Sequence, residues 1–201
     1  MNPTQLGDLL LLADPPARTR AALDLIGDRL HPELAKHPKV GARSQQACIL
    51  AALTVRDLLL AAGQRARVRP CRVQILRRDP EGTPTHELVI GDPDDTHASG
   101  HWNGHMIVET GELAIDPTLG QARRPQWPDL PLMLALPTLS SRGGVDDADP
   151  PGDAPITHLR SADRDVEVRW WPLDDKSWTG APDARAQRRR KAVQNLAQKL
   201  A

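Results

Sequence analysis

The sequence contains no phenylalanine and no tyrosine among its 201 residues, and tryptophan, with five copies, is its only aromatic residue. A core of this composition has to be built from leucine, isoleucine, valine and alanine, with tryptophan as the only large filler. The length is that of one ordinary domain that can bury a sizeable core. We therefore expect residues 1–201 to form a single domain.

The formal net charge is zero, because 26 basic residues balance 26 acidic ones. A nucleic-acid or membrane partner requires a net or local positive field, so the composition favours neither. The densest basic run, RRRK at 188–191, would spread around more than half of a helix and is expected to be solvated. No aromatic or groove-reading residues accompany this run, so the sequence predicts no nucleic-acid partner.

Cysteine is scarce, and the two copies, Cys48 and Cys71, cannot form a disulfide framework. A reducing compartment is the default for such a chain. The leucine run at 9–12 follows Asp8 and no basic residue, and it is too short for a membrane span or a signal peptide. We expect a cytoplasmic protein with no membrane partner and no cofactor.

The hydrophobic pattern and the positions of proline and glycine predict both helices and strands. Helices are expected at 4–13, from an N-cap at Asp14, from a cap at Ser44 to a stop at Gly63, and at 183–200. Strands are expected at 66–76, 85–90, 105–109, 112–116 and 165–173. The proline-containing segment 31–43 is expected to be a loop, and 138–156 a mobile surface loop within a stretch rich in proline, glycine and aspartate.

The segment GHWNGHMIVETGELAIDPTLGQ (100–121) is the most informative for function. A two-residue hairpin loop at Thr110 and Gly111 would place His105 directly opposite Asp116. Directly opposed residues share a face, with Cβ atoms roughly 5 Å apart. The carboxylate can then accept a hydrogen bond from one imidazole nitrogen and leave the other nitrogen free to act as a base.

A nucleophile for this base is available in Cys48, which lies in the first turn of the helix that follows Ser44. A helix N-terminus stabilises a thiolate, and a nearby imidazolium would depress the thiol pKa further. Free backbone N–H groups of the same turn could bind a developing oxyanion. A cysteine, a histidine and an aspartate in these positions follow the logic of a thiol acyl-transfer enzyme.

Four stretches carry a resemblance to a known family: SQQACILAALTVRDLLLAAG, QRARVRPCRVQIL, GHMIVE and AIDPT. In this order they resemble the transglutaminase-like branch of the papain-like cysteine fold, over residues 44–121. The resemblance implies an α+β fold in which the nucleophile-bearing helix packs on an antiparallel sheet, with extra helices at both termini. It implies Cys48 as nucleophile, His105 as base and Asp116 as the residue that orients the imidazole. The family often carries a tryptophan two residues after its histidine, where this chain has isoleucine.

The expected activity is that of a cysteine hydrolase or acyltransferase that cleaves an amide-type bond of a peptide or other amide substrate through a thioester. Protease, amidase, deamidase and transglutaminase share these steps and are not separated by the sequence. Further candidates are two glutamines as oxyanion donors, two residues that could line the cleft, and one asparagine that could orient the imidazole; these are Gln45, Gln46, His101, Trp102 and Asn103.

Each of these residues also has an ordinary structural interpretation. For Cys48, the ordinary interpretation of a free cysteine on an apolar helix is a small buried hydrophobe. Cys71 lies in the middle of the strand expected at 66–76, beside Pro70, and we take it as structural. The alternative function is therefore a catalytically inactive binding or scaffolding module of the same fold. A zinc site at His97, His101 and His105 is a third possibility, but Gly100 and Gly104 argue against the helix that this spacing would need. We predict no metal.

Overall fold

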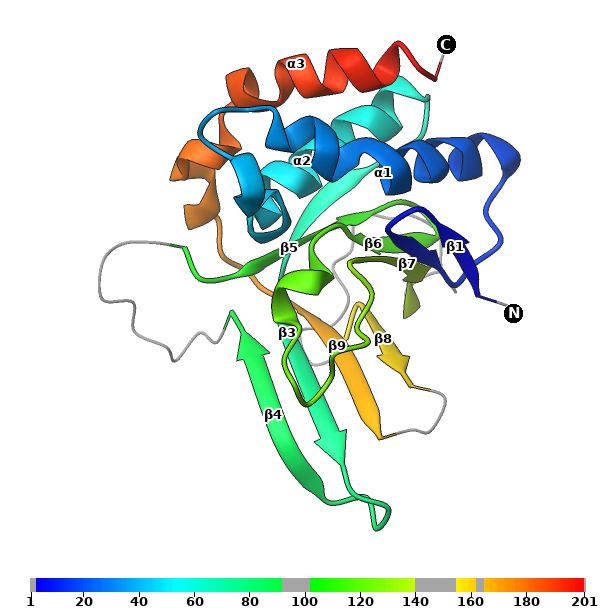
Figure 1. The fold of residues 1–201 in the computed structure, drawn as a ribbon, viewed down its shortest axis with the longest axis vertical. Helices are drawn as coiled ribbons and strands as arrows, with labels where there is room; N and C mark the ends of the chain where they lie inside the picture. The colour runs from blue at the N-terminus through cyan, green and yellow to red at the C-terminus, as the bar shows by residue number, and fades with distance from the viewer. Residues whose placement is uncertain (1–2, 92–101, 140–154, 162–164, 201) are drawn as a thin grey trace.

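A computed structural model of the chain describes residues 3–91, 102–139, 155–161 and 165–200. The fold is mixed α+β, as expected, with three α-helices in the described residues and a curled mixed sheet. The helices are α1 (Ala17–Ala35), α2 (Cys48–Ala61) and α3 (Ala186–Ala197). They lie together on one side of the strands, and a long hairpin extends away on the opposite side (Figure 1).

The described strands form one nine-stranded sheet in the order β1-β2-β7-β6-β5-β3-β9-β8, with β4 paired to β3. Their bounds are β1 (Thr4–Leu6), β2 (Leu9–Leu11), β3 (Arg67–Arg78), β4 (Pro84–Ile90), β5 (His105–Glu109), β6 (Leu113–Asp116), β7 (Met133–Pro137), β8 (Thr157–Arg160) and β9 (Val166–Pro172). The sheet is not purely antiparallel, because β2 runs parallel to β7. Four predicted strands match β3, β4, β5 and β9, and the fifth overlaps β6.

The N-terminal segment is a hairpin and not the helix expected at 4–13. Gly7, with a φ of 54°, turns the chain in the left-handed region that glycine adopts readily. After the turn, Leu9 and Leu11 are fully buried while Leu10 is partly exposed, which is the two-residue period of a strand. Four consecutive leucines hide this alternation in the sequence.

Helix α1 differs from its prediction at both ends. It begins at Ala17, and Pro16, not Asp14, occupies the N-cap position without a side-chain hydrogen bond. It continues through Pro32 to Ala35, so the first part of the predicted loop at 31–43 is helical. Pro32 is exposed while its neighbour His31 is buried, and we attribute the tolerance of this proline to the burial of the residues around it.

Helix α2 begins three residues later than expected. Ser44 lies in a preceding 3-10 helix, η1 (Gly41–Gln46), and the N-cap is Ala47, which makes no side-chain cap. The expected stop is confirmed, because Gly63 follows the helix with a φ of 75°. Cys48 is therefore the first residue of α2 and not a residue of its interior.

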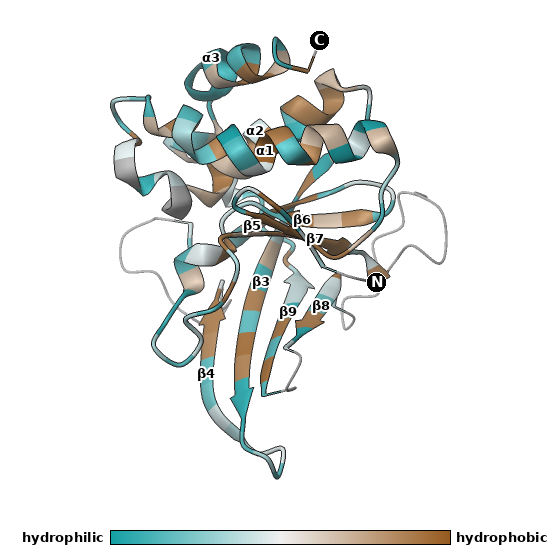
Figure 2. Cartoon of the chain, turned by 45° about the vertical axis from the view of Figure 1, so that its right-hand side comes forward, coloured by the Kyte–Doolittle hydropathy of each residue, from teal (hydrophilic) through white to brown (hydrophobic). Residues whose placement is uncertain are grey.

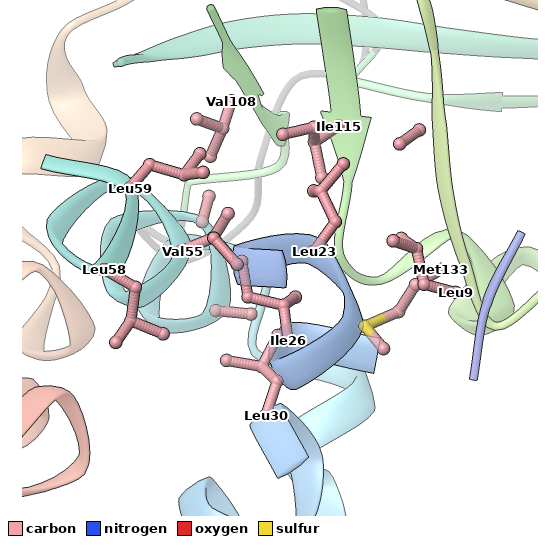
Figure 3. Packing of buried hydrophobic residues seen from close by; sticks show 14 of the residues in the cluster. Leu9, Leu23, Ile26, Leu30, Val55, Leu58, Leu59, Val108, Ile115 and Met133 are labelled. Carbon is pink, nitrogen blue, oxygen red and sulfur yellow. The ribbon is translucent and has the colours of Figure 1, made fainter. Parts of the chain in front are cut away.

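The main core lies between the helices and the sheet. Apolar side chains of α1 and α2 meet those of β5, β6, β7 and β2, as the close view in Figure 3 shows for Leu23, Val55, Val108, Ile115 and Met133. Strands β5, β6 and β7 appear as a strongly hydrophobic band beneath the helices in Figure 2. A second cluster covers the opposite face of the sheet and contains the fully buried residues Cys71 and Trp170.

The terminal helix is confirmed as α3, but the basic run within it is not wholly solvated. Arg189 is only 9% exposed, and its Nε donates a hydrogen bond of 2.6 Å to Asp57 Oδ2 of α2. A second bond of 2.9 Å goes to Ala184 O. Arg189 thus docks α3 on α2, and one position of the run is structural.

Strands β7 and β8 lie at the borders of the segment that the sequence indicated as loop, and residues 140–154 of that segment lie outside the described residues. In the described part of the chain, no helix combines the length and the apolar character needed to cross a membrane.

Candidate functional site

The hairpin of β5 and β6 brings His105 and Asp116 together, but in a register different from the predicted one. Val108 pairs with Ile115, and the Thr110 N–H bonds to Leu113 O at 2.9 Å, so the loop is Gly111 and Glu112. The Thr110 hydroxyl accepts the backbone N–H groups of residues 112 and 113, which fixes this turn. The register differs by two residues, so both side chains keep the same face, and His105 and Asp116 are diagonal neighbours.

The Asp116 carboxylate is the centre of a buried hydrogen-bond network. Oδ2 lies 2.8 Å from His105 Nε2 and accepts the indole N–H of Trp170 at 2.9 Å, while Oδ1 accepts the backbone N–H of Thr118 at 3.0 Å. The side chains of His105 and Asp116 are each 1% exposed. Three donors therefore hold the carboxylate in one orientation, and the carboxylate in turn orients the imidazole.

The second imidazole nitrogen is not free, contrary to the prediction. Gln121, in the 3-10 helix η2 (Leu119–Ala122), places its Nε2 2.6 Å from His105 Nδ1. A carboxylate can only accept and an amide NH₂ can only donate, so the imidazole proton sits on Nε2 and Nδ1 accepts from Gln121. Gln121 therefore covers the lone pair that a general base would use.

Cys48 reaches the start of β5 from the side of the helices. Its Sγ is partly buried and donates a hydrogen bond to Gly104 O at 4.0 Å. The pKa of the Cys48 thiol is raised to about 12, mainly by burial and further by the Asp116 carboxylate. The backbone N–H groups of Ile49 and Met106 lower this pKa, but their effect is smaller than that of burial. This direction is opposite to the one expected from the helix N-terminus alone, because loss of hydration outweighs the nearby N–H groups.

The thiol and the imidazole approach β5 from two sides. The thiol contacts backbone groups of Gly104 and Met106, the two neighbours of His105. The Met106 side chain belongs to the cluster under the helices, whereas His105 faces the opposite side with Ile107. Within the described residues, the thiol hydrogen bond goes to Gly104 O and both imidazole nitrogens are held by Asp116 and Gln121.

Cys71 is a neighbour that the sequence argument did not place near the site. It is the cross-strand partner of His105 in the β3–β5 pair, so the two side chains share a face. It is fully buried, and burial raises its pKa well above the ordinary value of a thiol. Its position explains why a small apolar side chain is needed there, since it packs beside the His105–Asp116 pair.

Among the remaining predicted residues, the structure describes the side chains of Trp102 and Asn103. Trp102 is partly buried, and its indole ring covers Gly104 so closely that a Cβ at Gly104 would lie 2.2 Å from Trp102 Cζ2. Asn103 lies between these two residues and is partly buried. Gln45 and Gln46 belong to η1, directly before Cys48, and their side chains lie outside what the structure describes. His97 and His101 also lie outside the described residues.

The alternative of a metal site gains no support from the described residues, among which no three potential ligand side chains gather. His105 itself is already committed to Asp116 and Gln121. The zinc hypothesis therefore depends on His97 and His101, which the structure does not describe.

The turn after Asp116 is anchored from α1. His31 is 4% exposed, and its Nε2 lies 2.8 Å from Pro117 O. Burial lowers the pKa of His31 below its ordinary value of 6.5, although the Pro117 carbonyl and the Asp8 carboxylate act in the opposite direction. The first helix thus holds the Asp-Pro-Thr turn through a neutral histidine.

This histidine predicts a pH dependence of folding. Because the pKa of His31 is lower in the folded state, the unfolded chain binds a proton at a higher pH, and stability falls as the pH drops below about 6.5. Urea unfolding between pH 7.5 and 5 should show this loss, and His31→Gln should reduce its slope. His158→Gln, at an exposed position on β8, serves as the control and should keep the slope of the parent. An unchanged slope in His31→Gln would contradict the assignment.

Comparison with known proteins found no match for this chain among family models, curated proteins or solved structures.

Proposed function

We propose that the protein is a thiol-dependent hydrolase or acyltransferase that acts on an amide-type bond, with Cys48 as nucleophile, His105 as base and Asp116 as the orienting carboxylate. The observation that carries the proposal is the buried His105–Asp116 pair, whose carboxylate is itself held by Trp170 and Thr118, beside a cysteine that opens α2. The combination resembles the transglutaminase-like branch of the papain-like fold, and we propose that the chain is a member of it.

The proposed reaction starts when the Gln121 amide leaves Nδ1 of His105. Because the thiol and the imidazole lie on two sides of β5, the imidazole must also move toward Sγ in this proposal. Nδ1 then accepts the Cys48 proton while sulfur attacks the carbonyl carbon of the amide. The tetrahedral intermediate collapses with loss of the amine, which takes the proton from Nδ1, and a thioester remains on Cys48. Water or a second amine attacks the thioester, gives its proton to Nδ1 and releases the acyl group, after which the proton returns to sulfur.

The raised thiol pKa places the proton transfer within the attack step. A thiol with a pKa of about 12 is almost fully protonated at pH 7, so a preformed thiolate is not the nucleophile in the resting state. The base must act during attack, as in serine enzymes, and this makes His105 essential to the rate. Asp116 keeps the Nε2 proton in place and thereby directs the Nδ1 lone pair to the reaction.

The test uses a small activated acyl donor, p-nitrophenyl acetate, because the natural substrate is not identified. In a Cys71→Ala background, the acetyl group is expected on the peptide that contains Cys48, as detected by mass spectrometry. Cys48→Ala should remove this adduct, and Cys71→Ala alone should keep it. Absence of a Cys48 adduct in the parent protein would contradict the proposal.

Gln121 predicts a change in thiol reactivity. Its hydrogen bond to Nδ1 holds the base in the resting state, and a neutral hydrogen bond of this kind is worth about 1 kcal/mol. Gln121→Ala is therefore expected to raise the rate of Cys48 alkylation by iodoacetamide at pH 7 about fivefold. Gln126→Ala, a glutamine of the following loop, is the matched control and should leave the rate unchanged. A rate that falls in Gln121→Ala would show that the amide supports the base instead of covering it.

The second candidate function is an inactive binding module of the same fold. It is favoured by one specific observation, which is that Asp116 and Gln121 take both nitrogens of a histidine that is 1% exposed. For such a module we expect no acetyl adduct on Cys48 and a large loss of stability in His105→Ala. The adduct experiment separates the two functions directly.

A further inference from the structure

A hollow opens beside the candidate nucleophile. It has a volume of about 140 Å³ and is lined by five residues: Lys39, Val40, Arg43, Ala47 and Asp183. Ala47 is the N-cap of α2 and directly precedes Cys48. Asp183, another lining residue, is one of the charges that raise the Cys48 pKa. A group bound in this hollow would therefore lie close to the first turn of α2, which carries Cys48.

The charges around the hollow are predominantly positive. Lys39 and Arg43 are exposed, and the Arg43 guanidinium donates to Lys39 O at 3.0 Å, which fixes its position at the rim. The single acid of the lining, Asp183, forms an ion pair with the Arg188 guanidinium, which partly offsets its negative charge. Two cations thus face a cavity several times larger than the volume of about 30 Å³ that one water molecule occupies.

We propose that this hollow binds a carboxylate of the substrate, so that the amide bond presented to Cys48 belongs to an acidic peptide or another carboxylate-bearing amide. The proposal rests on the proposed function, since it places this carboxylate on the molecule that the thiol attacks. Arginine recognises carboxylates through a planar pair of donors, and lysine adds a point charge.

The assignment is tested by the charge preference of Cys48 alkylation. Iodoacetate and iodoacetamide have nearly the same shape, but only iodoacetate carries the carboxylate. The ratio of their rate constants at Cys48 is measured by mass spectrometry of the peptide that contains Cys48. Arg43→Ala and Lys39→Ala are each expected to lower this ratio about threefold at low ionic strength. Arg43→Lys keeps the charge and should keep the ratio within about twofold.

A matched control is Arg29→Ala, an exposed cation of α1 outside the hollow, which should leave the ratio unchanged. Equal ratios in the parent, Arg43→Ala and Lys39→Ala would overturn the proposal, and so would an equal fall in Arg29→Ala. Thermal unfolding of each variant verifies that it is folded. His105→Ala should lower both rate constants and keep their ratio, so failure of the acyl chemistry and failure of the carboxylate site give different results.

Discussion

Replacing Asp116 by alanine is expected to lower the free energy of unfolding by about 3 to 5 kcal/mol. The substitution removes the acceptor for three donors: the Nε2 proton of His105, the indole N–H of Trp170 and the backbone N–H of Thr118. Asp116 is 1% exposed, so water cannot readily replace the lost partner. Each buried donor left without an acceptor costs about 1 to 3 kcal/mol. Urea unfolding monitored by tryptophan fluorescence gives the measurement.

Two further variants define this effect. Asp129→Ala removes an exposed carboxylate and should change stability by less than about 0.5 kcal/mol. Asp116→Asn retains the shape but turns one acceptor into a donor, so its stability should fall between the other two. A loss below about 1 kcal/mol in Asp116→Ala would mean that the network does not hold the site as described.

The second large effect concerns catalysis. His105→Ala is expected to lower the rate of Cys48 acetylation by p-nitrophenyl acetate by about a hundredfold to ten thousandfold, the usual contribution of a general base. The reason is that a thiol with a pKa of about 12 needs a base during the attack. His158→Ala, which removes an exposed histidine of β8, should acetylate at the parent rate. Equal rates in His105→Ala and His158→Ala would remove His105 from the mechanism.

Much of the candidate site follows from local sequence patterns. The two apolar runs around Thr110 and Gly111 predict a hairpin. The alternation of side chains along paired strands predicts a shared face for His105 and Asp116. The register error of two residues did not change this face, so the prediction of the pair was robust. The helix after Cys48 was equally clear from its apolar length and from the stop at Gly63.

Other parts of the site depend on contacts that no local pattern encodes. Trp170 comes from β9, far along the chain. Strand β3 separates β9 from β5, and the Trp170 indole reaches Asp116 across the face that Cys71 of β3 shares with His105. Gln121 was within the informative segment, but its role depends on η2 bending back over the imidazole. The spacing of five residues between Asp116 and Gln121, around the Asp-Pro-Thr turn, is the signal that could have suggested it.

The electrostatics of Cys48 were the least predictable element. The position at a helix N-terminus suggests a lowered thiol pKa, but the sequence does not show how much hydration the thiol loses on burial. The prediction of a helix at 4–13 was wrong for a related reason. Its leucine run is apolar on every residue, so only the pairing of β2 with β7 decides between helix and strand.

The most direct test of the account is the pH dependence of Cys48 alkylation by iodoacetamide in three proteins, all in a Cys71→Ala background: the parent, Gln121→Ala and His105→Ala. We expect the parent to keep a measurable rate between pH 6 and 8 and Gln121→Ala to raise this rate. His105→Ala should lower the rate by about a hundredfold or more, so that its main feature is the rise toward the thiol pKa of about 12. Identical profiles in all three proteins would contradict the account, because the thiol would then be a buried structural residue that His105 does not activate.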